Sequence, residues 1–383
     1  MNSLEHQLQY PHGDALPAVG GAITIAPGLK WLRMALPFAL DHINLWLLRD
    51  RVEDARGVVD GWAIVDCGIA NEPTRAAWEQ VFATQLEGMP VTRVICTHMH
   101  PDHIGNAHWL VERFACSFWI SILDWHVAQL GSLRTTGHGG TSAASHFAAH
   151  GLVDEEALAK VRARSNYYGS MVPAVPAVFQ RLQDGQRLRI GDHEWRCIAG
   201  YGHAPEHMAL FSESLGPLIP ESQAAPLPQG AAAAPGTARR SGVLISGDMV
   251  LPRISTNISV WDSEPESNPL QQYLDSLERY RTLPSETLVL PSHGRPFTGL
   301  QTRIDQLRTH HDERLADVMA ACRRGPTTAA DLIEVLFRRK LDLHQITFAM
   351  GESVAHLHKL WFDGQLQRER GADGILRFSA AAG

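Results

Sequence analysis

Three histidines and one aspartate within six residues constrain this chain more than any other feature. They are His98, His100, Asp102 and His103. The preceding apolar, β-branched run 91–96 predicts a buried strand, and residues two apart on a strand point the same way, so His98 and His100 can converge on one point. A proline ends that strand, and the turn after it can direct Asp102 and His103 toward a second point nearby. The run therefore predicts a layout for two metal ions.

The composition is that of an ordinary globular protein and excludes few functions. The chain has 383 residues, 44% of them hydrophobic and 20% charged, which is enough for one large domain and one small one. A net charge of −7 argues against nonspecific binding to nucleic acid. The five cysteines are scattered without a CxxC pair, and no signal-peptide pattern or long apolar stretch is evident. We therefore expect a cytoplasmic protein with reduced thiols and no membrane segment.

Short apolar strands separated by turn signals open the first predicted domain, residues 21–305, which follows an N-terminal tail at 1–20 that we expect to be partly disordered. These strands are predicted at 22–25, 31–36, 43–48 and 61–65, with one turn at 49–51. Helices and strands alternate after them, which is typical of an α/β or mixed layered sandwich. A largely helical insert is expected at 124–184. At 215–242, 16 of 28 residues are Ala, Pro or Gly, which predicts a flexible surface loop.

The C-terminal part, residues 306–383, shows a different pattern. A long linker helix is followed by two helices and two short strands, predicted at 301–323, 327–337, 344–362, 365–367 and 375–378. Two helices and a β-hairpin are the pattern of a winged helix. Residues 323–378 carry nine Lys or Arg against seven Asp or Glu, a weak footprint beside that of proteins that bind phosphate backbones. We therefore favour a packing or dimerisation module, and with it a homodimer, over nucleic-acid binding.

Later in the chain, one arrangement occurs three times: a strand ends, and a ligand-type residue follows at a glycine-containing turn. The residues are His203, Asp248 and His293. Strand ends hold ligands on rigid backbone, and glycine lets the chain pass close to an ion. Histidine and carboxylate ligands without cysteine suit two divalent ions, Zn²⁺, Mn²⁺ or Fe²⁺, of which we favour zinc.

The run 98–103 followed by His203, Asp248 and His293 resembles the metallo-β-lactamase-fold hydrolases, over roughly residues 20–300. The resemblance is to the glyoxalase II type rather than the antibiotic-degrading type, and it implies an α+β fold, a four-layer αββα sandwich. The winged-helix pattern, with the strand around 41–44, is similar to the subgroup of lactamase-beta-like endoribonucleases and related bacterial hydrolases. Because the module is not the helical glutathione-binding domain of glyoxalase II, we do not expect hydroxyacyl-glutathione as the substrate.

The resemblance also implies a role for each matching residue. The residues that match the ligands of the first ion are His98, His100 and His203. Those that match the ligands of the second ion are Asp102, His103 and His293. Asp248 matches the carboxylate that bridges the ions, and a bridging hydroxide is the usual nucleophile of the family. Asp102 and Asp248 are therefore the expected catalytic residues.

Five further side chains are candidates for the surroundings of the site. Asp66 ends a neighbouring strand, where it can orient a ligand histidine or be an ordinary turn residue. His207 is a candidate pocket residue, with a structural or surface histidine as the alternative. Arg253 can hold an anionic substrate tail, although we favour a surface ion pair. Tyr167 and Tyr168 can cap the cleft from the insert, or serve packing or a subunit contact.

The predicted activity is hydrolysis of a small acyl substrate, a thioester or an ester, by hydroxide held between two divalent ions. The insert and the loop after Asp248 are expected to shape the substrate pocket. The same site can attack phosphorus, so an endoribonuclease or phosphodiesterase is the first alternative, and a lactonase is another. A metal-containing DNA-binding regulator is the alternative outside enzymes.

Overall fold

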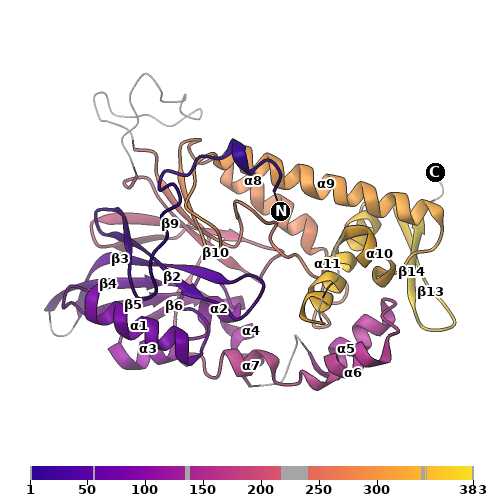
Figure 1. Ribbon diagram of the computed structural model, residues 1–383, viewed down its shortest axis with the longest axis horizontal. Helices are drawn as coiled ribbons and strands as arrows, with labels where there is room; N and C mark the ends of the chain where they lie inside the picture. The colour runs from indigo at the N-terminus through magenta and orange to yellow at the C-terminus, as the bar shows by residue number, and fades with distance from the viewer. Residues whose placement is uncertain are drawn as a thin grey trace.

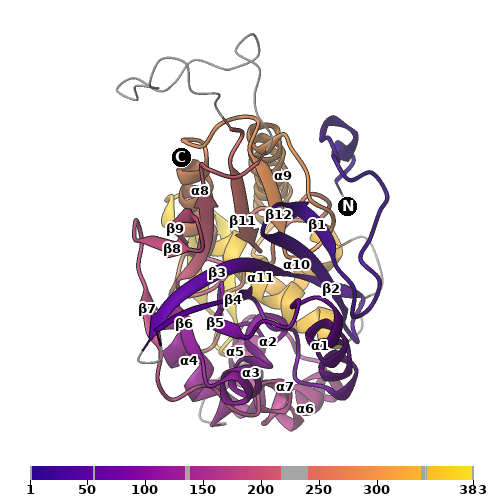
Figure 2. The ribbon, with the colours of Figure 1, turned by 90° about the vertical axis from the view of Figure 1, so that its left-hand side faces the viewer.

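Two β-sheets pack face to face, and helices cover the outer face of each, which gives the predicted αββα sandwich (Figure 1, Figure 2). The computed structural model describes residues 2–54, 57–133, 139–216, 240–337, 341 and 343–381. The helices α1 (Glu72–Thr84) and α3 (Ala107–Phe114) lie on the outer face of the first sheet. The helices α8 (Pro269–Tyr280) and α9 (Leu300–Arg324) lie on the outer face of the second.

The two sheets contain seven and five strands. The first has the order β1 (Ile23–Ala26), β2 (Leu29–Ala35), β3 (His42–Asp54), β4 (Gly57–Val65), β5 (Val91–Ile95), β6 (Ser117–Ser121) and β7 (Gln180–Leu182). The second has the order β12 (Leu288–Pro291), β11 (Val243–Gly247), β10 (His207–Ser212), β9 (His193–Gly200) and β8 (Arg187–Ile190). β4 and β5 are parallel, and so are β11 and β12, whereas β10 pairs antiparallel with β11.

Successive residues of β3 belong to two different cores. Trp46 and Leu48 face the second sheet, where the Trp46 ring stacks on Trp31 with 6.4 Å between the ring centroids. Leu45 and Leu47 face α1. Because both faces of the strand are buried, this part of its sequence is continuously apolar instead of alternating.

The β3–β4 hairpin is longer than predicted, because β3 continues through 49–51, where the sequence indicated a turn. Asp50 explains the difference. Its side chain is fully buried, and it accepts hydrogen bonds from Arg93 Nε at 2.7 Å and from Thr92 Oγ1 at 2.6 Å. In a single sequence, a charged residue that is paired inside the fold has the same appearance as one in a surface turn.

Residues 2–20 pack against the first domain, which corrects the prediction of a partly disordered tail. A short 3₁₀ helix, η1 (Glu5–Gln7), comes first, and Leu8 is buried directly after it. Asn2 Nδ2 donates a hydrogen bond to the Pro252 carbonyl at 3.0 Å. The polar composition of this segment concealed the contact, because hydrogen bonds to distant parts of the chain hold much of it.

The insert is helical, as predicted. Its helices are α4 (Ile122–Ser132), α5 (Gly140–Ala149), α6 (Glu155–Ala163) and α7 (Tyr167–Met171). Asp154 caps α6 by accepting a hydrogen bond from the Ala157 N–H at 2.9 Å. Most of the predicted flexible loop at 215–242 lies outside the described residues. No helix in the described part of the chain is long and apolar enough to cross a membrane.

The elements after α9 form what we call the C-terminal module, residues 325–381. They follow the predicted order of two helices and a hairpin, namely α10 (Ala329–Leu336), α11 (Leu343–Phe362), β13 (Leu366–Arg370) and β14 (Leu376–Ala380). The winged-helix assignment and the boundary at 305/306 stay predictions. α11 packs closely against the first domain, since a Cβ atom at Gly351 would lie 2.6 Å from Ser259 Cβ.

Replacing Asp50 by Asn should lower the free energy of unfolding by about 3 kcal/mol or more, because the Arg93 side chain, 9% exposed, loses its buried carboxylate. Urea denaturation followed by tryptophan fluorescence measures this change. Asp60→Asn is the matched control, since Asp60 pairs with Arg51 on the surface of the same hairpin, and the midpoint should hardly move. Equal shifts in the two variants would contradict the role given to Asp50.

Candidate metal centre

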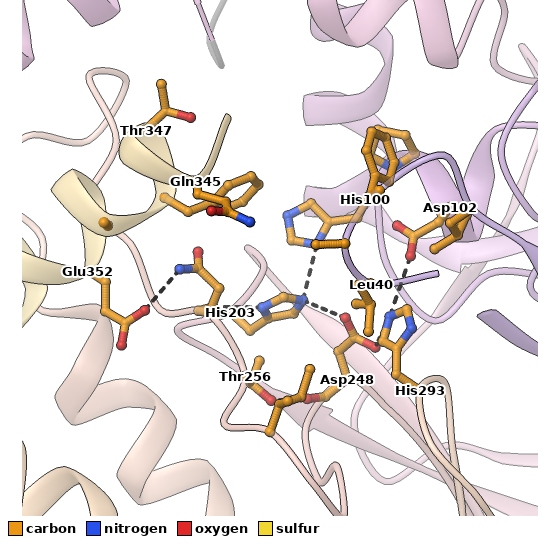
Figure 3. A pocket seen from close by; sticks show the side chains of 18 of the residues that line it. Leu40, His100, Asp102, His203, Asp248, Thr256, His293, Gln345, Thr347 and Glu352 are labelled. Atoms are coloured by element: carbon orange, nitrogen blue, oxygen red, sulfur yellow. Dashed lines mark hydrogen bonds and ion pairs between the residues drawn. The ribbon is translucent and has the colours of Figure 1, made fainter. Parts of the chain in front are cut away.

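The loops that carry the seven predicted ligands meet at one end of the two sheets. Figure 3 shows five of these residues, His100, Asp102, His203, Asp248 and His293. Four of the residues follow β5, in the loop and in the one-turn helix α2 (Pro101–Ile104). The other three follow β9, β11 and β12. Because β4 and β5 are parallel, and β11 and β12 are parallel, the carboxyl ends of these strands lie together, and the residues after them converge.

The first group of donors consists of three histidine nitrogens and one carboxylate oxygen. His98 Nε2 lies 2.9 Å from His100 Nδ1 and 3.2 Å from His203 Nε2, and these last two atoms are 3.0 Å apart. Asp248 Oδ2 lies 3.3 Å from His203 Nε2. Neighbouring ligands of a tetrahedral zinc ion bound at about 2.0–2.1 Å are roughly 3.3 Å apart. The group therefore has nearly the spacing of a tetrahedral site.

The second group consists of Asp102, His103 and His293. Asp102 Oδ2 lies 3.4 Å from His293 Nε2 and 3.7 Å from His103 Nε2. The other oxygen of Asp248, Oδ1, lies 3.4 Å from His293 Nε2 and 3.6 Å from His103 Nε2. Asp248 thus presents one oxygen to each group, which is the geometry of a carboxylate that bridges two ions.

Four of the histidines present Nε2 to the site, and each has a partner for Nδ1. The pairs are His98 with Thr97 Oγ1 (3.0 Å), His103 with Asp66 Oδ2 (2.8 Å), His203 with the Asn257 carbonyl (2.8 Å) and His293 with the His42 carbonyl (2.7 Å). A carbonyl or carboxylate partner keeps the proton on Nδ1 and leaves the Nε2 lone pair for a metal ion. Asp66 therefore lies against a ligand histidine, where the sequence placed it.

Burial and neighbouring charges prepare these groups for cations. Burial, and then the nearby His103 and His100, hold the pKa of His98 well below its ordinary value, so this ring is neutral at pH 7. Burial acts to raise the pKa of Asp248, but His293 and His103 outweigh it, and the pKa falls well below its usual range. The carboxylate of Asp248 is therefore ionised and can hold a cation.

Two buried donor atoms support the fit of a metal. His103 Nε2 and Asp248 Oδ1 have no hydrogen-bond partner in the part of the chain that the structure describes. Buried polar atoms without partners are unfavourable unless an ion or water satisfies them. Both atoms lie where the two donor groups face each other, so this His/Asp cluster is suited to a dinuclear metal site.

His207 is not a pocket residue, which corrects one prediction. Its ring is buried on β10 behind Asp248, and its Nε2 accepts a hydrogen bond from the Asp248 N–H at 3.2 Å. Burial is the main cause that lowers its pKa to about 3, so the ring is a neutral structural group. Gly247 (φ +53°) makes room for the ring, because a Cβ there would lie 2.0 Å from His207 Nε2.

Arg253 also lies outside the cleft, which corrects a second pocket prediction. Its Nε is 3.0 Å from Glu5 Oε2, and its carbonyl accepts a hydrogen bond from the Asn2 N–H at 2.7 Å. The pocket prediction is wrong because the N-terminal residues fold onto this loop, where Glu5 forms an ion pair with the Arg253 guanidinium. The ion-pair interpretation describes the residue correctly.

A cleft of about 620 Å³ opens over the donor groups, a size typical of small-molecule sites. Tyr167 and Tyr168 of α7 line it, and the Tyr168 hydroxyl donates to the Met99 carbonyl at 2.5 Å. Five residues of the segment after Asp248 line it as well: Leu251, Ile254, Ser255, Thr256 and Asn257. The insert and this loop thus shape the cleft, as the sequence predicts.

Two further parts of the wall were missed by the sequence reasoning. One is the loop 36–40 between β2 and β3, and the other is α11, which faces His100 and Asp102 across the cleft (Figure 3). The lining residues of α11 include Gln345, Phe348, Ala349 and Glu352, spaced as one face of a helix. Gln345 and Glu352, the two polar side chains on this face, indicated a possible functional surface, but the sequence does not show where the helix docks.

The partners of two ligand histidines were also missed. Asn257 and His42 act through their backbone carbonyls, and a carbonyl acceptor has no side-chain signature in a sequence. His42 in addition accepts the Gly294 N–H at its Nε2 at 2.8 Å, which holds the loop that carries His293.

Comparisons with known proteins agree with this architecture. The profile of the metallo-beta-lactamase superfamily matches residues 44–216, and that of the metallo-beta-lactamase-like C-terminal domain matches residues 315–381. A crystal structure of a beta-lactamase domain protein from Burkholderia ambifaria is 50% identical with a TM-score of 0.86, and the match covers 99% of this chain and 100% of that one. A crystal structure of a metallo-beta-lactamase family protein from Thermus thermophilus is 26% identical with a TM-score of 0.68, and the match covers 94% of this chain and 100% of that one. The "Probable metallo-hydrolase YqjP" of Bacillus subtilis (strain 168) is 24% identical over 343 residues, 86% of this chain and 91% of that relative.

The chain belongs to the metallo-beta-lactamase superfamily. More particularly, it is a metallo-hydrolase of that superfamily, with the C-terminal domain and the His/Asp cluster described above.

Metal-loaded wild-type protein should carry close to two divalent ions per chain, and His98→Ala or Asp248→Ala should lose at least one of them, because each removes a donor from the first group. Elemental analysis after dialysis measures the metal content. His126→Ala is the matched control, since this exposed ring on α4 is hydrogen-bonded to the Ile122 carbonyl and belongs to neither donor group, so the variant should keep the full content. An Asp248→Ala protein that retains both ions would refute the assignment.

Proposed function

We propose that this protein hydrolyses thioesters or esters of small acyl molecules with the help of two divalent metal ions. We expect these ions to be zinc, and manganese or iron would act in a similar way. The character of the cleft supports an acyl substrate. Apart from the candidate ligands, only Arg164 and Glu352 are charged among the described residues that line it. The apolar part of the lining includes Leu36, Phe38, Leu40, Trp261 and Phe348.

The apolar lining has two effects on a bound acyl group. It removes apolar substrate surface from water, which favours binding, and it excludes bulk water from the reacting end. Arg164 contributes a single positive charge, and its guanidinium packs over the Tyr167 ring at 5.0 Å from the centroid. A cleft with this lining favours an acyl chain over a phosphate backbone, which proteins bind with several cations.

The chemistry divides between the metal ions and the chain. Two bound divalent ions would supply an activated water near neutral pH and polarise the substrate carbonyl. The Asp102 carboxylate lines the cleft and is positioned to accept a hydrogen bond from the attacking water and to take its proton. Asp248 presents one carboxylate oxygen to each donor group. Asp102 can then return that proton to the sulfur or oxygen of the leaving group as its bond to the acyl carbon breaks. The resulting thiol or alcohol departs through the cleft, since His98 and His103 close the floor of the site.

The alternatives have less support. A lactone is an internal ester, so lactone hydrolysis falls within the same proposal. Ribonuclease or phosphodiesterase activity would use the same donor groups. However, the described residues of the cleft do not form the cationic groove that such a substrate would need. A DNA-binding role would require an open face on α11, whereas Met350, Val354 and Ala355 are buried and the Glu352 face lines the cleft.

A metal-reconstituted sample should hydrolyse thioesters, esters or lactones and leave phosphodiesters and short RNA intact under the same conditions. Asp102→Asn should reduce kcat/KM by at least roughly 100-fold, because an amide cannot take the proton of the attacking water. Asp312→Asn, on the exposed side of α9, is the control and should keep wild-type activity. RNA cleavage without acyl hydrolysis would overturn the proposal.

Acyl-chain length provides an independent measurement. For straight-chain acyl groups, kcat/KM should rise by up to roughly fourfold per methylene, since each buried methylene contributes about 0.8 kcal/mol. Phe348→Ala should flatten this dependence, because Phe348 is part of the apolar lining. Phe362→Ala is matched to it, since that ring is 50% exposed on the same helix. If the slope stays the same in Phe348→Ala, the acyl group binds elsewhere.

A further inference from the structure

Glu352 places a carboxyl group in the cleft away from the metal centre. It belongs to the face of α11 that lines the cleft, and it lies beside Asn257 and not among the ligands (Figure 3). On this face, Phe348 and Ala349 are apolar neighbours. An acidic side chain in mostly apolar surroundings is unfavourable unless a partner compensates it. The chain supplies only part of that compensation.

The carboxyl group is held firmly. Asn257 Nδ2 donates a hydrogen bond to Glu352 Oε2 at 3.2 Å. The amide of Asn257 is oriented by Ser259, whose hydroxyl donates to Asn257 Oδ1 at 2.7 Å. The Val260 N–H donates to the Gly351 carbonyl at 3.1 Å, which fixes α11 to the same segment. The position of Glu352 is therefore a property of the fold and not of a flexible side chain.

The second oxygen of this group is available to a ligand. In the described part of the chain, no group donates a hydrogen bond to Glu352 Oε1. His356 Nδ1 donates to the backbone carbonyl of Glu352 at 2.8 Å and does not reach the carboxyl group. Among the described residues, Arg314 of α9 acts electrostatically on the Glu352 carboxyl group, and Arg164 of the insert lines the same cleft.

The charge of Glu352 depends on pH near neutrality. Burial raises the pKa of Glu352 to about 7, while the hydrogen bond from Asn257 and the charge of Arg314 act in the opposite direction. The group is neutral below this pH and carries a negative charge above it. A cation bound at Oε1 would favour the charged form.

We propose that Glu352 is a specificity-determining residue that binds an ammonium group at the end of the acyl chain away from the reacting carbon. This inference rests on the proposed function and narrows it to thioesters or esters of ω-amino acids. With its carbonyl carbon beside Asp102 and Asp248, such a chain would run along the apolar lining to Glu352. An ammonium group satisfies the free oxygen and neutralises its charge, whereas a hydroxyl group can do only the first.

The test uses metal-loaded, full-length protein and the carboxylate products, which bind without turnover. Calorimetry compares 6-aminohexanoate with hexanoate and 6-hydroxyhexanoate, and repeats the comparison for chains of four to eight carbons. At the best length, wild type should bind the amino compound at least roughly tenfold more tightly than the plain acid. This preference should grow from pH 6 to pH 8 as Glu352 loses its proton, since the ammonium group stays charged over this range.

Glu352→Gln should remove the preference for the amino compound and its pH dependence, while the metal content stays as in wild type, because Glu352 belongs to neither donor group. Glu334→Gln, which removes an exposed carboxylate from α10 of the same module, should change neither. Equal affinities for the two acids in wild type, a larger preference for the hydroxy compound, or an unaltered preference in Glu352→Gln would overturn the inference. A clear preference without hydrolysis of any acyl compound would instead refute the proposed function alone.

Discussion

The Asp248 carboxylate faces both groups of histidines, and much of the structure serves to keep it there. The turn after β11 is held from several sides: the His207 ring accepts the Asp248 N–H, the Thr256 hydroxyl donates to the Asp248 carbonyl, and the Tyr273 hydroxyl donates to the Met249 carbonyl. Without this support a buried carboxylate between imidazoles would turn toward water. The backbone of this one turn therefore fixes where Asp248 presents its two oxygens.

Sequence reasoning located the seven donor residues because each signal is local. A buried strand is recognisable by its apolar run, and a polar residue directly after it lies at the edge of the sheet, as with His98 after β5 and Asp248 after β11. The position of Asp66 at a strand end could be predicted by the same argument. The layered class of the fold followed from the order of helices and strands.

What could not be predicted depends on contacts between distant segments. Asp50 gave a turn signal, but its partner Arg93 lies on another strand. Arg253 was placed near the pocket because the contact of its loop with Glu5 is invisible in the local sequence. The docking of α11 over the cleft is a similar case. The amphipathic pattern of a helix shows that one face packs against the protein, but it does not identify the segment against which that face packs.

The close contact between Gly351 and Ser259 has a consequence for how this cleft can be altered. A Cβ atom at position 351 has no room, so any larger residue would push α11 away from the first domain. The lining residues of α11 would then move together, as a rigid unit, while the donor groups on the sheet-end loops would stay in place. One residue that touches neither ligand nor substrate thus sets the width of the opening, and redesign of the enzyme for bulkier molecules should begin there.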